Sequence, residues 1–136
     1  MHLMSLLLLA QSFPLQTTDS LIPHKTTITP VVYRDLKSIR VTGDGDQSLV
    51  VISGTEFTNG TIEVEMAGAP GAGAGAGARG FVGLAFRASK DLSHFEAFYL
   101  RPTNGRAEDQ VRRNHSAQYI STPEFPWERL RKEFPE

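Results

Sequence analysis

The fold class is decided by residues 80–101, which read GFVGLAFRASKDLSHFEAFYLR. Alternate side chains of a β-strand point to opposite faces of the sheet, so an apolar period of two indicates a strand with one covered face. Two runs, 80–88 and 94–101, have this period. We expect two strands whose core-facing side chains are Val82, Leu84 and Phe86 in the first run and Phe98 and Leu100 in the second.

Residues 61–67 have the same period, and their apolar side chains alternate with Glu63 and Glu65. When the apolar series of the three expected strands are aligned, the opposite series form a second face, with small residues in the middle and charged or aromatic residues around them. This is the composition of a shallow binding surface, although a face that simply meets solvent or is half covered by an opposite sheet fits equally well. The second face comprises Glu63, Glu65, Gly83, Ala85, Arg87, Ala97, Tyr99 and Arg101.

Turn signals divide the first half of the chain into short segments. Gly43-Asp44-Gly45-Asp46 separates residues 38–42 from 48–53, and Asn59-Gly60 precedes residues 61–67. Glycine beside Asn or Asp supplies the positive φ angles of tight hairpin turns, so both positions predict hairpins. Short strands and frequent turns, without an amphipathic helix early in the chain, predict an all-β sandwich.

Composition excludes several classes of protein. The 136 residues fit one domain, and 14 Lys and Arg against 15 Asp and Glu leave no basic surface of the kind that nucleic acid requires. Because there is no cysteine, the chain has no disulfide, thiolate nucleophile or Cys-type zinc site. We expect a single domain over 13–136 with a flexible Gly/Ala loop at 67–80, and one edge strand from residues 11–30.

The first residues have the character of a secretory leader. A short apolar stretch ends at Ala10-Gln11-Ser12, which places small residues where a signal peptidase cleaves. The stretch is too short to span a bilayer, which takes about 20 apolar residues. We expect a signal peptide at 1–12 and a secreted or periplasmic protein without a membrane span; a buried N-terminal strand is the alternative.

The segment after residue 102 is dense in polar groups and ends in a helical pattern. Residues 127–134, WERLRKEF, predict a short helix that caps the sheet, with Trp127 on its apolar face. The polar groups upstream are expected to hold a loop through backbone carbonyls rather than to bind a ligand. This structural polar cluster comprises Asp109, Arg112, Arg113, Asn114 and Gln118.

Three runs together resemble a known family. They are FTNGTIEVEMAG, ARGFVGLAFR and FEAFYLRPTNGRAEDQVRRNHSAQYISTPEFPWERLR, within residues 39–136. They are similar to secreted bacterial proteins with a concanavalin A-like lectin/glucanase (laminin-G-like) jelly roll, some described as 3-keto-disaccharide hydrolase-like domains. The resemblance implies a two-sheet antiparallel jelly roll that holds glycans on a concave face. Members of the family continue beyond the Trp-x-x-Leu-Arg segment, so the resemblance also implies an incomplete jelly roll with open sheet edges through which the chain self-associates.

We therefore expect a carbohydrate-binding or adhesion-type module with a glycan or oligosaccharide as its partner. Sugars stack their CH faces on aromatic rings, and their hydroxyl pairs suit the planar fork of an arginine. Alternatively, the arginines form structural ion pairs with neighbouring carboxylates. For the chain as a whole, a further alternative is a non-catalytic protein-interaction domain. The candidate ligand-binding residues are Arg87, Glu96, Tyr99, Arg101 and Trp127.

A glycoside hydrolase is the remaining alternative. Glucanases of this superfamily carry Glu-x-Asp-x-x-Glu on one strand, and the nearest match begins with Glu63 and Glu65 but has Gly68 in place of the last carboxylate. A retaining mechanism needs two opposed carboxyl groups, so the sequence favours a non-catalytic module. Asp44 and Asp46 offer oxygen ligands for Ca²⁺, but calcium takes 6–8 oxygens and the turn explains both residues, so no cofactor is expected.

Overall fold

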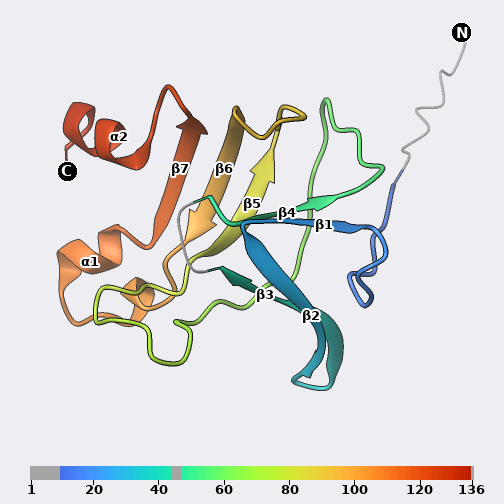
Figure 1. The fold of residues 1–136 in the computed structure, drawn as a ribbon. Helices are drawn as coiled ribbons and strands as arrows, with labels where there is room; N and C mark the ends of the chain where they lie inside the picture. The colour runs from blue at the N-terminus through green and yellow to red at the C-terminus, as the bar shows by residue number, and fades with distance from the viewer. Residues whose placement is uncertain (1–9, 44–46, 136) are drawn as a thin grey trace, which may run out of the picture. The chain divides into compact units, whose positions relative to one another are not determined.

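The chain is an all-β protein, as predicted. The computed structural model describes residues 10–43 and 47–135 (Figure 1). Its strands pair antiparallel in three separate sheets, with two short α-helices and one 3₁₀ turn. The chain divides into two compact units, Met1–Thr55 and Glu56–Glu136, which are described one at a time below.

The first unit consists of two pairs of strands. β1 (Leu21–His24) pairs with β4 (Leu49–Ile52), and β2 (Thr26–Tyr33) pairs with β3 (Leu36–Gly43). The expected lead-in therefore supplies two strands instead of one. Lys25, with a positive φ of 50°, separates them and lets each join a different partner.

The hairpin of the first unit forms at a place that the turn signals did not predict. Tyr33 pairs with Leu36, and the two residues between them, Arg34 and Asp35, have φ angles of 48° and 65°. Two consecutive positive φ angles are the geometry of a type I′ turn, which usually uses Asn-Gly. The expected pairing across Gly43–Asp46 is wrong for the described strands, because β3 and β4 each pair with a strand from the lead-in.

The expected strand at 61–67 is also wrong. Residues 53–81 form no strand, and the apolar side chains of the alternating run are all about two-fifths exposed. An alternating pattern does not provide the partner strand that must satisfy its backbone hydrogen bonds. The Gly/Ala run instead bends in two hydrogen-bonded turns, Ala74 N to Gly71 O and Ala78 N to Gly75 O.

The second unit is built on one three-stranded sheet, in the order β5 (Val82–Phe86), β6 (Phe95–Leu100) and β7 (Ala117–Thr122) (Figure 1). Its register places Gly83, Tyr99 and Gln118 side by side across the three strands. Both strands predicted from residues 80–101 are confirmed. β7 was not predicted, because its polar sequence lacks a clean apolar alternation.

Along β6, the burial of the two faces is the reverse of the expectation. Ala97 and Arg101, assigned to the open side, are both 7% exposed, and Phe95 on the same side is 5% exposed, whereas Phe98 and Leu100, assigned to the core, are 50% and 41% exposed. Alternation sorts side chains onto two faces but does not say which face the rest of the chain covers. The Tyr99 side of the sheet is therefore the more buried one.

The segments after β6 complete the second unit. The 3₁₀ turn Asn104–Arg106 and α1 (Gln110–Asn114) lead into β7, and α2 (Trp127–Glu133) follows it. The helix expected within residues 127–134 is confirmed. No helix in the described part of the chain is long and apolar enough to cross a membrane.

Candidate functional site

Arg101 lies beside two aromatic rings on the Tyr99 face of the three-stranded sheet. Its guanidinium carbon is 5.3 Å from the centre of the Tyr99 ring and 5.8 Å from the centre of the Phe81 ring. The two rings meet edge to face, with centres 5.7 Å apart. Tyr99 and Arg101 share a face because they are two residues apart along the chain, while Phe81 arrives from the residue before β5. We call Phe81, Tyr99 and Arg101 the aromatic–arginine site.

The hydrogen-bond partners of the Arg101 guanidinium are all neutral. Nη1 donates to the His115 carbonyl oxygen at 3.1 Å, and Nη2 donates to the Tyr99 hydroxyl at 3.3 Å and to Gln118 Oε1 at 3.4 Å. Arg101 forms no ion pair with any carboxylate among residues 10–43 and 47–135. Burial lowers the pKa of Arg101, because removing a cation from water disfavours its charged form.

Asn104 lies beside Arg101 and leaves one polar atom unpaired. Its Nδ2 donates to the His115 carbonyl oxygen at 3.2 Å, the same oxygen that accepts from Arg101. The residue is 5% exposed, and its Oδ1 is buried and accepts no hydrogen bond within the described structure. A buried polar atom without a partner costs about 1–3 kcal/mol of folding free energy. The fold therefore leaves one hydrogen-bond acceptor of Asn104 unsatisfied.

Further arginines act electrostatically on this site. Arg131 of α2 and Arg79 at the end of the Gly/Ala run both lower the pKa of Arg101 further, because like charges repel. The Arg131 guanidinium carbon is 5.2 Å from the centre of the Trp127 ring. The Arg79 carbonyl oxygen accepts from Thr103 N at 3.3 Å, which ties the end of the run to the chain just after Arg101.

Tyr99 has a raised pKa. Its partial burial is the main cause, and the negative charge of Glu128 in α2 adds to it, while Arg101 and Arg131 act in the opposite direction. The hydroxyl of Tyr99 therefore stays protonated and accepts a hydrogen bond from Arg101. The ring and the guanidinium lie side by side.

Arg87 and Glu96, also expected to bind ligand, form a separate cluster. Arg87 Nη1 donates to Glu96 Oε1 at 2.7 Å, and the Tyr119 hydroxyl donates to Glu96 Oε2 at 2.7 Å. Both hydrogen bonds lower the pKa of Glu96, and the bond from Tyr119 to Glu96 raises the pKa of Tyr119. Glu96 and Tyr119 belong to the sheet face opposite Tyr99, and Arg87 reaches them because its φ of 51° interrupts the strand alternation. Arg87 therefore does not join Arg101.

The loop between β5 and β6 carries a second polar group of side chains. Asp91 accepts hydrogen bonds from the Ser89 hydroxyl and from both the hydroxyl and the amide of Ser93, which lower its pKa to about 2. The Ser93 hydroxyl also lies 2.9 Å from His94 Nδ1, and His94 Nε2 lies 3.6 Å from Glu124 Oε1. Ser93 and His94 both precede β6, so their side chains do not alternate as they would on a strand. Ser93 Oγ donates to Asp91 Oδ1 at 2.8 Å, so this arrangement holds the loop between β5 and β6 together.

The expected structural polar cluster is spread over α1 and its surroundings. Asp109 caps α1 by accepting from Val111 N at 2.9 Å, and Arg113 donates to the Ala107 carbonyl at 2.6 Å. Asn114 Oδ1 accepts from Gln110 Nε2, and Arg112 is an exposed residue of the same helix. Gln118 is separate from these residues and belongs to the surroundings of Arg101.

The carboxylates expected to act in catalysis do not lie on the sheet. Glu63 and Glu65 are exposed in a segment without strands, so they do not line the sheet. Asp44 and Asp46 lie outside the described residues. Within residues 10–43 and 47–135, no three His, Asp or Glu side chains gather as a metal ion would require.

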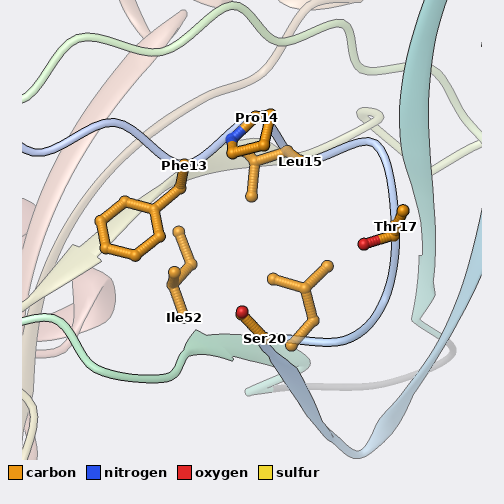
Figure 2. A pocket seen from close by; sticks show the side chains of 7 residues that line it. Phe13, Pro14, Leu15, Thr17, Ser20 and Ile52 are labelled. Carbon is orange, nitrogen blue, oxygen red and sulfur yellow. The ribbon is translucent and has the colours of Figure 1, made fainter.

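A hollow in the first unit is too small for a sugar. Phe13, Pro14 and Leu15 of the lead-in and Ile52 of β4 surround it, and the hydroxyls of Thr17 and Ser20 point into it (Figure 2). Its volume is about 50 Å³. Small-molecule sites usually measure about 300–1,000 Å³, so this hollow is a gap between packed side chains.

Comparison with known proteins adds no relative. No family model, no curated protein and no solved structure matches the chain. The resemblance to the concanavalin A-like family therefore stays a prediction that rests on the sequence alone.

Of the residues expected to bind ligand, the structure brings together Tyr99 and Arg101. Trp127 and its neighbour Arg131 belong to the helix whose charges act on that pair. Sequence reasoning missed Phe81 and Asn104. The position of Phe81 was predictable, because Phe81 is two residues before Gly83 and so belongs to the same face as Tyr99, the strand partner of Gly83. Nothing local distinguishes Asn104 from an ordinary turn residue.

Proposed function

We propose that this chain is a carbohydrate-binding or adhesion-type module of a secreted or periplasmic protein, and that it holds its glycan at the aromatic–arginine site. The expected leader at 1–12 supports the secreted or periplasmic location, and the resemblance to concanavalin A-like modules supports the binding of glycans. The proposal adds a location, which differs from the sequence expectation by leaving out Arg87, Glu96 and Trp127 and including Phe81.

One observation carries the proposal. The Phe81 ring is 60% exposed although it lies beside a buried arginine. An exposed aromatic ring offers a platform for the CH face of a sugar, and the polar groups next to it offer donors and acceptors for hydroxyls. The Tyr99 hydroxyl and the amide of Gln118 already lie within hydrogen-bond distance of Arg101. Pre-ordered polar groups lower the entropy cost of binding.

A binding role fits this surface better than hydrolysis. Hydrolysis of a glycosidic bond by the common mechanism takes two carboxyl groups on opposite sides of that bond. Glu96, the one carboxylate in the three strands of the β5–β6–β7 sheet, is by contrast paired with Arg87 and Tyr119 on the other face. The aromatic–arginine site itself consists of a cation and two rings.

The test compares two exposed phenylalanines on opposite faces of one sheet. The full chain and its Phe81→Ala and Phe98→Ala variants are screened against a panel of immobilised oligosaccharides, and each hit is measured by calorimetry. Phe98 is 50% exposed and lies on the face away from Tyr99, so its removal is a matched control. We expect Phe81→Ala to weaken binding about fivefold, because stacking on an aromatic ring is worth about 1 kcal/mol.

The thermal melt of each variant separates a binding residue from a structural one. Loss of affinity in Phe81→Ala with an unchanged melting temperature supports the proposal. Equal loss in both variants, or no binding by the parent chain, would overturn it. A parent chain that binds no sugar but forms a specific oligomer would favour the protein-interaction alternative instead.

A further inference from the structure

The Asn59-Gly60 dipeptide lies in an irregular, exposed segment of the second unit. Its sequence predicted a hairpin turn leading into a strand at 61–67, but residues 53–81 form no strand. Both Asn59 and Gly60 are exposed. The dipeptide therefore has no strand ladder on either side to restrict how its backbone and side chain meet.

The two reacting groups of this dipeptide are unrestrained in the described structure. Within residues 10–43 and 47–135, the Asn59 side-chain amide and the Gly60 backbone nitrogen form no hydrogen bond. Gly60 has a φ of 148°, a conformation that residues with a side chain rarely adopt. Because Gly60 also has no Cβ, no side chain hinders the approach of its nitrogen to Cγ of Asn59.

The tripeptide Thr-Asn-Gly occurs twice in the chain, at 58–60 and at 103–105, and the second copy is held in place. Asn104 is 5% exposed and begins the 3₁₀ turn. Its Nδ2 donates to the His115 carbonyl oxygen at 3.2 Å, and its backbone nitrogen donates to the Arg101 carbonyl oxygen at 2.9 Å. Its own carbonyl oxygen accepts from Ala107 N at 3.0 Å. The two copies therefore share a sequence and differ in structure.

We propose that Asn59 is a site of spontaneous deamidation, which converts it to isoaspartate and aspartate. The Gly60 nitrogen forms a bond to Cγ of Asn59, and the side-chain amide leaves as ammonia, taking the proton of the Gly60 nitrogen with it. The product is a succinimide ring. Water then opens the ring: addition at Cγ restores the normal main chain as aspartate, and addition at the Asn59 main-chain carbonyl gives isoaspartate. The reaction consumes water and releases ammonia.

The products change the charge and length of the segment without disturbing the sheet. Both add a negative charge to an exposed stretch that already carries Glu56 and Glu63. Isoaspartate also adds a methylene group to the main chain. Because no strand ladder passes through residues 53–81, neither product breaks strand pairing. We expect the converted chain to keep its melting temperature. The inference does not depend on the proposed glycan site.

The test follows both tripeptides in the full chain by peptide mapping and mass spectrometry during incubation in neutral buffer. Deamidation is detected as the replacement of an amide by an acid, and chromatography separates the isoaspartyl from the aspartyl peptide. Digestion in mildly acidic buffer prevents further reaction, since the attacking nitrogen reacts as its anion. We expect conversion at Asn59 to be at least about tenfold faster than at Asn104, because reaction at Asn104 requires a local opening that breaks several hydrogen bonds.

Unfolding and substitution provide the controls. In concentrated urea both copies of the tripeptide lose their structure, so their rates should converge as Asn104 becomes accessible. Asn59→Gln is expected to abolish conversion at this position, because the longer side chain would have to close a larger ring. The variant should melt with the parent chain, since the Asn59 amide makes no hydrogen bond within residues 10–43 and 47–135.

The outcomes decide whether structure selects Asn59. Equal rates at Asn59 and Asn104 in the folded chain, or faster conversion at Asn104, overturn the inference. A rate difference that persists unchanged in urea also overturns it, because the difference would then come from the flanking sequence. Faster conversion at Asn59 in the folded chain, with isoaspartate among the products and convergence in urea, supports it.

Discussion

Gly83 controls how closely β5 approaches the strand that carries Tyr99, and replacing it with alanine tests the geometry of the site. A Cβ atom at this position would lie 2.5 Å from both Cα and Cβ of Tyr99 and closer still to the carbonyl oxygen of Phe98. Carbon atoms in contact are normally about 3.5–4.0 Å apart. The β5–β6 pair must therefore open by about 1 Å in Gly83→Ala, because the atoms in the way belong to the backbone or are fixed to it.

The cost of this opening has two parts. Overpacking costs about 1–3 kcal/mol, and each backbone hydrogen bond of the β5–β6 ladder that is lost costs about 1 kcal/mol. We expect Gly83→Ala to lower the free energy of unfolding by about 2–4 kcal/mol. For a domain of about 60–100 residues, each kcal/mol moves the melting temperature by about 4–8 °C.

Gly77 provides a matched control in the same unit. A Cβ atom there meets nothing within 4 Å, and the residue does not have a positive φ. Gly77→Ala is expected to leave stability unchanged or raise it by about 0.4–1 kcal/mol, because alanine restricts the unfolded chain. Urea unfolding followed by Trp127 fluorescence and by circular dichroism gives both values. Equal midpoints for the two variants would refute the close approach of β5 to Tyr99.

Three further predictions test other parts of the second unit. Hydrogen bonds from Ser89 and Ser93 lower the pKa of Asp91 to about 2, so its contribution to stability is present above its ordinary value of 3.8 and is lost as the pH falls towards 2. Asp91→Asn should therefore melt below the parent at pH 7 and converge with it near pH 2, and a difference that does not depend on pH would contradict this. Phe95 is 5% exposed, so Phe95→Ala is expected to cost about 3–5 kcal/mol in urea unfolding and to exceed the cost of truncating the half-exposed Phe98; the reverse order would restore the predicted faces. Glu96 raises the pKa of Tyr119 by accepting its hydroxyl proton, so Glu96→Gln should lower the tyrosine pKa in an ultraviolet titration, and an unchanged curve would argue against that hydrogen bond.

The candidate site was only partly predictable from the sequence. Tyr99 and Arg101 were predicted to share a face because a period of two follows from the geometry of any strand. The same strand alternation predicted that Arg87 shares their face. Its positive φ, which the alternation does not predict, directs the side chain to Glu96 instead. Phe81 joins the site through its contacts with Tyr99 and Arg101, which follow from the pairing of β5 with β6 and are not local.

The sequence alone determined the all-β class, the strands within residues 80–101 and the C-terminal helix, because each follows from local periodicity and turn chemistry. Tertiary structure decided the remainder. The run at 61–67 has a strand pattern but no partner, β3 and β4 pair with strands of the lead-in, and the Phe95 face is buried instead of the Phe98 face. Strand pairing and burial depend on segments far apart in the chain, whose competition for the same hydrogen bonds and apolar surface is settled only when the chain folds.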